Sequence, residues 1–322
     1  MIATSPRITP LPAAAVGTKF CDTLDIDREA QRLYAGDNWS GGVDVFDIAT
    51  PEARYLKTIK TKGGFYGVAV AKDLGKVFVG LAGGNLGVID IDPASKTADT
   101  FVARVDIGAK GSTDLIEYVP QHGKVYAGMH SDRFVGVVDA VTHAVVARIE
   151  GLGPDVEQPR YNAADGMVYV AARTSNTLHQ IDPSTDRLVA TFEIGTPCNP
   201  NGVAIDPKRN IALLVSDKHP LTVVWDLARQ KVAAVIEGSG GGDGAVYDET
   251  VDCFFGAHPG MTGGPVIGVF CGDPLRLVAN APTTKGASWV AYDRANRLLY
   301  TPAVAEGRPA LFATPLPAGA GR

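Results

Sequence analysis

One hairpin-like segment recurs seven times along the chain, and this repetition limits the possible folds more than any other feature. Residues 126–139 show the plan: an apolar run, a polar turn and a second apolar run that ends at Asp139. The equivalent positions are Tyr34, Phe78, Tyr126, Tyr169, Leu213, Phe254 and Leu299. They are separated by 44, 48, 43, 44, 41 and 45 residues. A period of roughly 40–50 residues is typical of the four-stranded blades of a propeller.

We therefore predict an all-β, seven-bladed β-propeller that fills residues 1–322 as one domain. The last repeat ends after its third strand, and the segment at residues 7–11 precedes the first repeat without a partner. We expect this N-terminal strand to complete the last blade and close the ring. The predicted blades span approximately residues 16–64, 65–112, 113–155, 156–199, 200–242, 243–286 and 287–317.

The composition agrees with this architecture and excludes several classes of partner. The chain is 45% hydrophobic, enough for a large core, and its 37 glycines and 21 prolines suit many short turns. The formal net charge is −5 and there is no Lys/Arg cluster, which argues against nucleic acid as a partner. No run approaches the roughly 18 apolar residues of a membrane span. The N-terminus lacks a secretory pattern, which predicts a cytoplasmic protein, or a periplasmic one if a leader was removed.

Four cysteines are too few for a disulfide scaffold. Cys253 and Cys271 fall on the two arms of one predicted hairpin, where they either form a bridge or remain free thiols, depending on the register. We expect Cys21 and Cys198 to be small buried residues.

Several short motifs resemble those of the YVTN-type seven-bladed β-propeller proteins. They are the predicted second strands Lys76–Val79 and Lys124–Ala127, and the runs Val88–Pro93 and Asn199–Pro207. The resemblance covers nearly the whole chain and implies the same fold. It does not imply one function, because such proteins serve as scaffolds, ligand binders and enzymes.

The topology brings two layers of residues to one mouth of the central channel, because the first strand of each blade begins at the end where its second and third strands are joined. The layer at the entrance comprises Asp22, Tyr66, Asp114, Glu157, Asn201, Asp243 and Ala287. The layer three residues deeper comprises Asp25, Ala69, Glu117, Arg160, Ala204, Ala245 or Val246, and Val290. A purely structural ring would carry small or apolar residues here, whereas this one is rich in ionisable groups.

Three histidines occupy similar hairpin turns in the third, fifth and sixth repeats: His130, His219 and His258. With Glu117 or Asp114 they could hold one divalent metal ion, or act as acid–base groups without a metal. The alternative without a functional role is that each histidine is a solvated turn residue. We expect the remaining histidines, His122, His143 and His179, to be structural or solvated.

Other rim residues are candidates for binding a small-molecule substrate. Arg160, Arg173 and Lys218 could bind an anion, and Asn201 lies at the entrance. Trp39, Tyr66 and Trp289 could stack against a flat or apolar ligand, although Trp289 could equally pack between blades. Residues 238–244 and 260–264 are glycine-rich and could form mobile rim loops, but they lack the context of a nucleotide-binding motif, so no nucleotide cofactor is expected.

These features favour a small-molecule enzyme with lyase, hydrolase or isomerase chemistry at the channel mouth, acting on a polar or anionic substrate. Streptogramin-lyase-like propellers are similar in architecture, which supports this hypothesis by analogy. No motif for covalent serine or cysteine catalysis occurs. The alternative is a non-catalytic propeller that binds a ligand, a protein or nucleic acid, or that serves as a structural part of a larger assembly.

Overall fold

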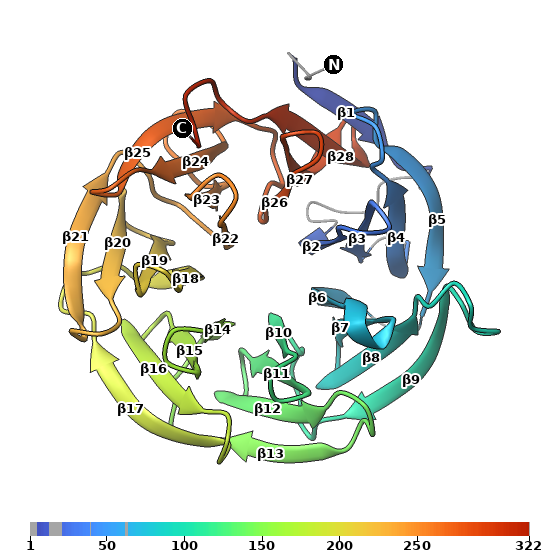
Figure 1. Cartoon of the computed structure of the whole chain (residues 1–322), viewed down its shortest axis with the longest axis horizontal. Helices are drawn as coiled ribbons and strands as arrows, with labels where there is room; N and C mark the ends of the chain where they lie inside the picture. Colours follow the sequence, from blue (N-terminus) through green and yellow to red (C-terminus); the bar gives the residue numbers. More distant parts are fainter. Residues whose placement is uncertain (1–4, 13–20, 39, 62–63, 322) are drawn as a thin grey trace.

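The computed structural model describes residues 5–12, 21–38, 40–61 and 64–321. In these ranges, 28 strands form seven four-stranded antiparallel sheets, and the sole helical element is a 3-10 turn, η1 (Lys72–Leu74). The sheets are arranged as blades around a central axis (Figure 1). The predicted seven-bladed β-propeller is therefore confirmed. No helix in the described ranges is long and apolar enough to cross a membrane.

Each blade runs outward from an inner strand that faces the axis. The inner strands are β2 (Cys21–Asp27), β6 (Phe65–Ala71), β10 (Ile116–Val119), β14 (Val156–Asn162), β18 (Pro200–Asp206), β22 (Ala245–Asp248) and β26 (Ala291–Asp293). The second strands are β3 (Arg32–Asp37), β7 (Lys76–Leu81), β11 (Lys124–Met129), β15 (Met167–Ala172), β19 (Ile211–Ser216), β23 (Cys253–His258) and β27 (Leu298–Ala305). The third strands are β4 (Gly42–Asp47), β8 (Asn85–Asp90), β12 (Phe134–Asp139), β16 (Thr177–Asp182), β20 (Leu221–Asp226), β24 (Val266–Cys271) and β28 (Arg308–Pro315). The outer strands are β5 (Arg54–Lys60), β9 (Thr100–Asp106), β13 (Val145–Ile149), β17 (Arg187–Glu193), β21 (Lys231–Glu237), β25 (Arg276–Pro282) and β1 (Arg7–Pro10).

The ring is closed by the N-terminal strand, as predicted. Strand β1 pairs antiparallel with β28, with Arg7 opposite Ala313 and Pro10 opposite Ala310, and so becomes the outer strand of the last blade. This pairing covers the edge that β28 would otherwise expose. The two ends of the described chain are thereby joined in one sheet (Figure 1).

Burial follows the position of a strand within its blade. The second and third strands are buried on both faces, as in β11 and β12, because each sheet packs against a neighbouring blade on either side. Outer strands alternate between exposed and half-buried residues, as β17 does. The core consequently lies between blades, where apolar side chains such as Phe78 and Phe134 pack together.

The aspartates that end the third strands stabilise the turns that follow. Asp139 accepts hydrogen bonds from the backbone N–H groups of Val141 and Thr142, at 3.0 and 2.7 Å. Asp182 accepts one from the N–H of Ser184 at 2.8 Å. These bonds replace backbone pairing where the strand stops, which explains why an aspartate recurs at this point of the repeat.

The four cysteines form one disulfide and two free thiols, one of the arrangements that the sequence allowed. Cys253 and Cys271 lie directly opposite each other on β23 and β24 and form a disulfide, a bond that persists mainly in oxidising compartments. Cys21 and Cys198 are buried free thiols, as expected. Burial raises the pKa of the Cys198 thiol to about 12, so this residue remains a protonated core side chain.

Candidate functional site

Two cavities follow each other along the axis and share Leu115 and Trp289 as walls. The mouth cavity, of about 240 Å³, is lined by five residues of the predicted entrance layer: Asp22, Asp114, Glu157, Asn201 and Asp243. The axial chamber, of about 290 Å³, is lined by six residues of the predicted deeper layer: Asp25, Ala69, Glu117, Arg160, Ala204 and Val246. The expected two-layer arrangement is present for these residues.

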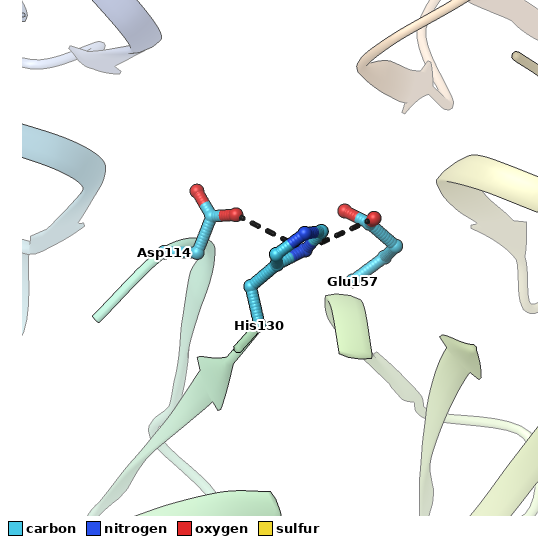
Figure 2. A group of neighbouring side chains, drawn as sticks. All are labelled: Asp114, His130 and Glu157. Atoms are coloured by element: carbon cyan, nitrogen blue, oxygen red, sulfur yellow. Dashed lines mark ion pairs between the residues drawn. The ribbon is translucent and has the colours of Figure 1, made fainter. Parts of the chain in front are cut away.

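His130 is the centre of the mouth cavity. It directly follows β11, and its imidazole lies between two carboxylates (Figure 2). Its Nδ1 atom is 3.3 Å from Oε1 of Glu157 and 3.8 Å from Oδ2 of Asp114. One potential ligand atom from each of the three residues lies within 4.8 Å of the other two. This group combines one imidazole with two carboxylates, a donor set suited to first-row divalent ions.

Asp155 lies beside the second ring nitrogen of His130. Its Oδ1 atom lies 3.3 Å from Nε2 of His130, and its Oδ2 accepts a hydrogen bond from the hydroxyl of Thr174. That bond lowers the pKa of Asp155, so the residue is a carboxylate. Carboxylates beside both nitrogens favour the protonated imidazolium when no metal is bound. With a metal ion at Nδ1, Asp155 would keep the remaining proton on Nε2.

Asp155 was not among the predicted site residues. It directly precedes β14, in a left-handed backbone conformation with φ of 58°, so the alternation of side chains along a strand does not predict its position.

Close contact between blades positions Asp114. Its backbone N–H donates to the carbonyl of Gly128, and its carbonyl accepts from the N–H of Gly67, at 2.9 and 2.8 Å. The same carbonyl packs against Gly80 of β7, where an added Cβ would lie 2.7 Å away. Glycine at position 80 therefore allows the backbone that carries Asp114 to approach the second blade closely.

The mouth cavity is electronegative. Four of its lining residues are acidic, and one arginine and one histidine face them. The arginine, Arg173, is already surrounded by carboxylates: Glu157 at 3.4 Å, Asp217 at 3.7 Å and Asp155 at 4.0 Å. The Glu157 carboxylate raises the pKa of His130, while burial opposes this shift. The charge balance favours a cation in this cavity.

The axial chamber contains an ion pair between the third and fourth blades. Nη1 of Arg160 lies 2.6 Å from Oε2 of Glu117, and the guanidinium carbon lies 5.7 Å from the centre of the Trp289 ring. Asp25 accepts backbone hydrogen bonds from Ile26 and Val70, at 2.8 and 2.7 Å. Burial raises the pKa values of both Asp25 and Glu117.

The three histidines predicted to act together are not brought together. His130 lies one residue beyond its strand, His219 three residues beyond β19, and His258 is the last residue of β23. The three rings consequently lie in different places: His130 in the mouth cavity, His219 in a separate cavity and His258 in the core. The expectation of a joint three-histidine metal site is therefore corrected.

His258 is fully buried, with its ring against the backbone at Gly242, Gly256 and Gly268. Burial lowers its pKa to about 4, so it is a neutral core residue at neutral pH. His219 lines a separate 280 Å³ cavity between rim loops, and its Nε2 lies 3.1 Å from Oδ1 of Asn199. Neither residue lines the mouth cavity.

The predicted anion-binding residues also differ from expectation. Arg160 and Arg173 lie in different cavities, and each is paired with carboxylates, so they do not form one anion clamp. Lys218 is exposed beside His219, and Tyr66 is half-buried and lines neither axial cavity.

Of the remaining predicted binding residues, Asn201 lines the mouth cavity and donates to Asp243 at 3.2 Å. Trp289 is 6% exposed and contributes to both cavities, which combines the packing and ligand-contact roles considered for it. Trp39 lies outside the described residues. Among the histidines expected to be structural, His179 is buried, with its ring nitrogens 3.0 and 2.9 Å from the hydroxyls of Thr177 and Thr191.

Comparison with known proteins establishes the fold class. The chain is similar to one in a solved structure titled "Crystal Structure of Mitotic Checkpoint Complex", with a TM-score of 0.77 and 13% sequence identity over 98% of this chain and 94% of that one. Neither a protein-family model nor a curated protein sequence matches this chain. At this identity the likeness concerns the fold alone, and fold does not imply function. The protein is a seven-bladed β-propeller with an acidic channel mouth.

Proposed function

We propose that the channel mouth binds one divalent metal ion through Asp114, His130 and Glu157 and uses it to transform a small polar molecule, by hydrolase, lyase or isomerase chemistry. The observation that carries this proposal is the convergence of one imidazole and two carboxylates within 4.8 Å of one another. Glu157 is only 3% exposed, and its buried Oε1 atom forms no hydrogen bond within the described chain. Its charged neighbours are Nδ1 of His130 at 3.3 Å and Nε of Arg173 at 3.4 Å, and Arg173 is shared with Asp155 and Asp217. A metal ion would give this buried carboxylate a directly coordinated cation.

A bound ion would polarise a carbonyl group or lower the pKa of a coordinated water. The surrounding residues have separate tasks. Asp155 holds the proton on Nε2 of His130, so that Nδ1 can serve as a ligand. Arg173 balances the charges of Glu157 and Asp155. Asp243 and Asp22 line the same cavity and are the carboxylates placed to accept a proton from a substrate or a water.

The charge of the cavity narrows the choice of substrate. An anionic substrate, one of the two kinds expected from the sequence, would meet four acidic residues in the mouth cavity. We therefore favour a substrate whose reacting end is uncharged and coordinates through oxygen. We also propose that the chain is a divergent relative of the YVTN-type propellers, on the basis of the repeated Lys-Val-aromatic second strands β7 and β11.

The test is metal analysis of untagged protein after incubation with Zn²⁺, Mn²⁺ or Co²⁺ and removal of the free ion. The parent should retain about one ion per chain, and His130→Ala should lose affinity by roughly 10- to 100-fold or more. His122→Ala is the matched control, since His122 lies beside Tyr161, away from the mouth cavity. Asp114→Asn provides a second, nearly isosteric variant, and melting curves show that each variant is folded. Absence of specific binding in the parent would refute the proposal.

A cation-binding module without catalysis is the second candidate. It is favoured by the observation that carboxylates flank both nitrogens of His130 and so hold the ring in place. The similar solved chain belongs, by its title, to a complex, and a surface for another protein is one form that this alternative could take. A metal-loaded parent that turns over no ester, lactone or hydroxy-acid substrate in a screen would favour this candidate.

A further inference from the structure

The axial chamber below the mouth cavity is a second candidate binding site, and its chemistry differs from that of the mouth cavity. The chamber has room for a ligand because two blades carry small residues, Ala69 and Ala204, at inner-strand positions where other blades carry Asp25, Glu117 and Arg160. Its volume of about 290 Å³ lies just below the range of roughly 300–1,000 Å³ found for ligand pockets. A compact molecule therefore fits this chamber.

The guanidinium group of Arg160 presents an open edge. Its Nη1 atom is used by Glu117 at 2.6 Å and by the carbonyl of Pro159 at 3.2 Å. Its Nε and Nη2 atoms have no hydrogen-bond partner among the described residues and are not enclosed by protein. The side chain is nevertheless only 16% exposed, and the Trp289 ring lies beside it. A pair of N–H donors in this fixed geometry matches the two oxygens of a carboxylate.

Two carboxyl groups in the same chamber call for a positively charged group on the ligand. Asp25 and Glu117 both line the chamber and lie close enough for each charge to act on the other. Each of their oxygens uses one lone pair on a backbone N–H or on Arg160, so further lone pairs remain for a donor. A positively charged donor is the partner that two neighbouring carboxyl groups prefer.

The charge of the chamber decides between classes of ligand. The chamber is lined by two acidic residues, Asp25 and Glu117, and by two arginines, Arg28 and Arg160. A simple anion or a simple cation would unbalance these charges, and a simple cation would also leave the donors on the open edge of Arg160 without a partner. A zwitterion adds no net charge and satisfies both poles. Apolar residues, including Leu115, Ile205 and Val246, also line the chamber.

We propose that the axial chamber binds a neutral α-amino acid, with its carboxylate on the open edge of Arg160 and its ammonium group toward Asp25 and Glu117. The proposal extends the proposed function by naming the class of substrate, yet it depends on the chamber alone. An amino acid seated in this way lies on the axis directly below the mouth cavity, with which the chamber shares Leu115 and Trp289.

The test uses the full chain freed of metal by chelation, so that the chamber is examined separately from the mouth. The standard amino acids are added singly at millimolar concentration, and binding is measured by thermal shift and by calorimetry. The best binder is then compared with its α-hydroxy acid, which lacks the ammonium group, and with its amide, which lacks the carboxylate. Each analogue should bind about tenfold more weakly or worse, because each loses a charged hydrogen bond.

Two variants locate the site. Glu117→Gln keeps the shape of the side chain but removes its charge and should weaken binding about tenfold, whereas the same exchange at the exposed Glu193 should have no effect. Ala204→Met fills the chamber without altering a charge and should abolish binding, with circular dichroism confirming the fold. The proposal fails if no standard amino acid binds, if an analogue binds as tightly, or if both chamber variants bind like the parent. Metal binding at the mouth would be unaffected by that failure.

Discussion

A single methyl group added at Gly80 should destabilise the propeller and disturb its channel mouth together. Gly80 lies in β7, and a Cβ built there would be 2.7 Å from the carbonyl oxygen of Asp114 and closer still to that of Thr113. An ordinary carbon–oxygen contact is about 3.3–3.6 Å. Both obstacles are backbone atoms, so neither can move aside as a flexible side chain would.

The expected loss of stability follows from the backbone contacts that the added methyl group would disturb. The Asp114 peptide unit is held by hydrogen bonds to Gly128 and Gly67, at 2.9 and 2.8 Å. Overpacking costs roughly 1–3 kcal/mol, and each of these hydrogen bonds contributes about 1 kcal/mol. We expect Gly80→Ala to lower the free energy of unfolding by about 3–5 kcal/mol. At about 2–4 °C per kcal/mol, the melting temperature should fall by roughly 6–20 °C.

Calorimetry or thermal melting in parallel with metal titration is the appropriate assay. Gly64→Ala is the control, because the nearest atom to its added Cβ is a side-chain oxygen of Asn38 at 3.0 Å, which can move. This control should melt within about 2 °C of the parent. If Gly80→Ala also melted within that margin and bound metal like the parent, glycine-dependent blade contact would not be what positions Asp114.

Three further predictions test other parts of the structure. Asp155→Ala should weaken metal binding by roughly 10- to 100-fold. In Asp155→Asn the amide oxygen can still accept a hydrogen bond from Nε2 of His130, so this variant should recover part of the lost affinity and restore the Co²⁺ absorption spectrum. Equal loss of affinity in both variants would contradict the positioning role of Asp155. Reducing the Cys253–Cys271 disulfide, which spans 18 residues, should cost about 3 kcal/mol and lower the melting temperature, with thiol titration to verify reduction. Because burial lowers the pKa of His258 from 6.5 to about 4, the unfolded chain binds its proton at higher pH than the folded chain does, so stability should fall as the pH drops from about 6.5 to 4. His258→Leu should reduce that slope by up to about 1.4 kcal/mol per pH unit, and identical pH profiles would contradict the assignment.

The sequence alone was sufficient for the blade count, the strand order and the ring closure. Each blade is built from consecutive strands, so the repeat spacing and the aspartates that end the third strands already specify the local pairing. The two channel layers could also be predicted, because Asp114 and Glu117, or Glu157 and Arg160, stand three residues apart in or just before equivalent inner strands.

Only the tertiary structure decided which of these residues meet. His130 and His258 look alike in the sequence, yet one lies just beyond its strand and the other at its last residue, so one ring reaches the channel and the other the core. Asp155 lies opposite His130 because the fourth blade packs closely against the third, and Arg160 meets Glu117 for the same reason. Strand pairing within a blade is local and follows the repeat, whereas contacts between blades depend on packing distances and on the face from which each side chain departs.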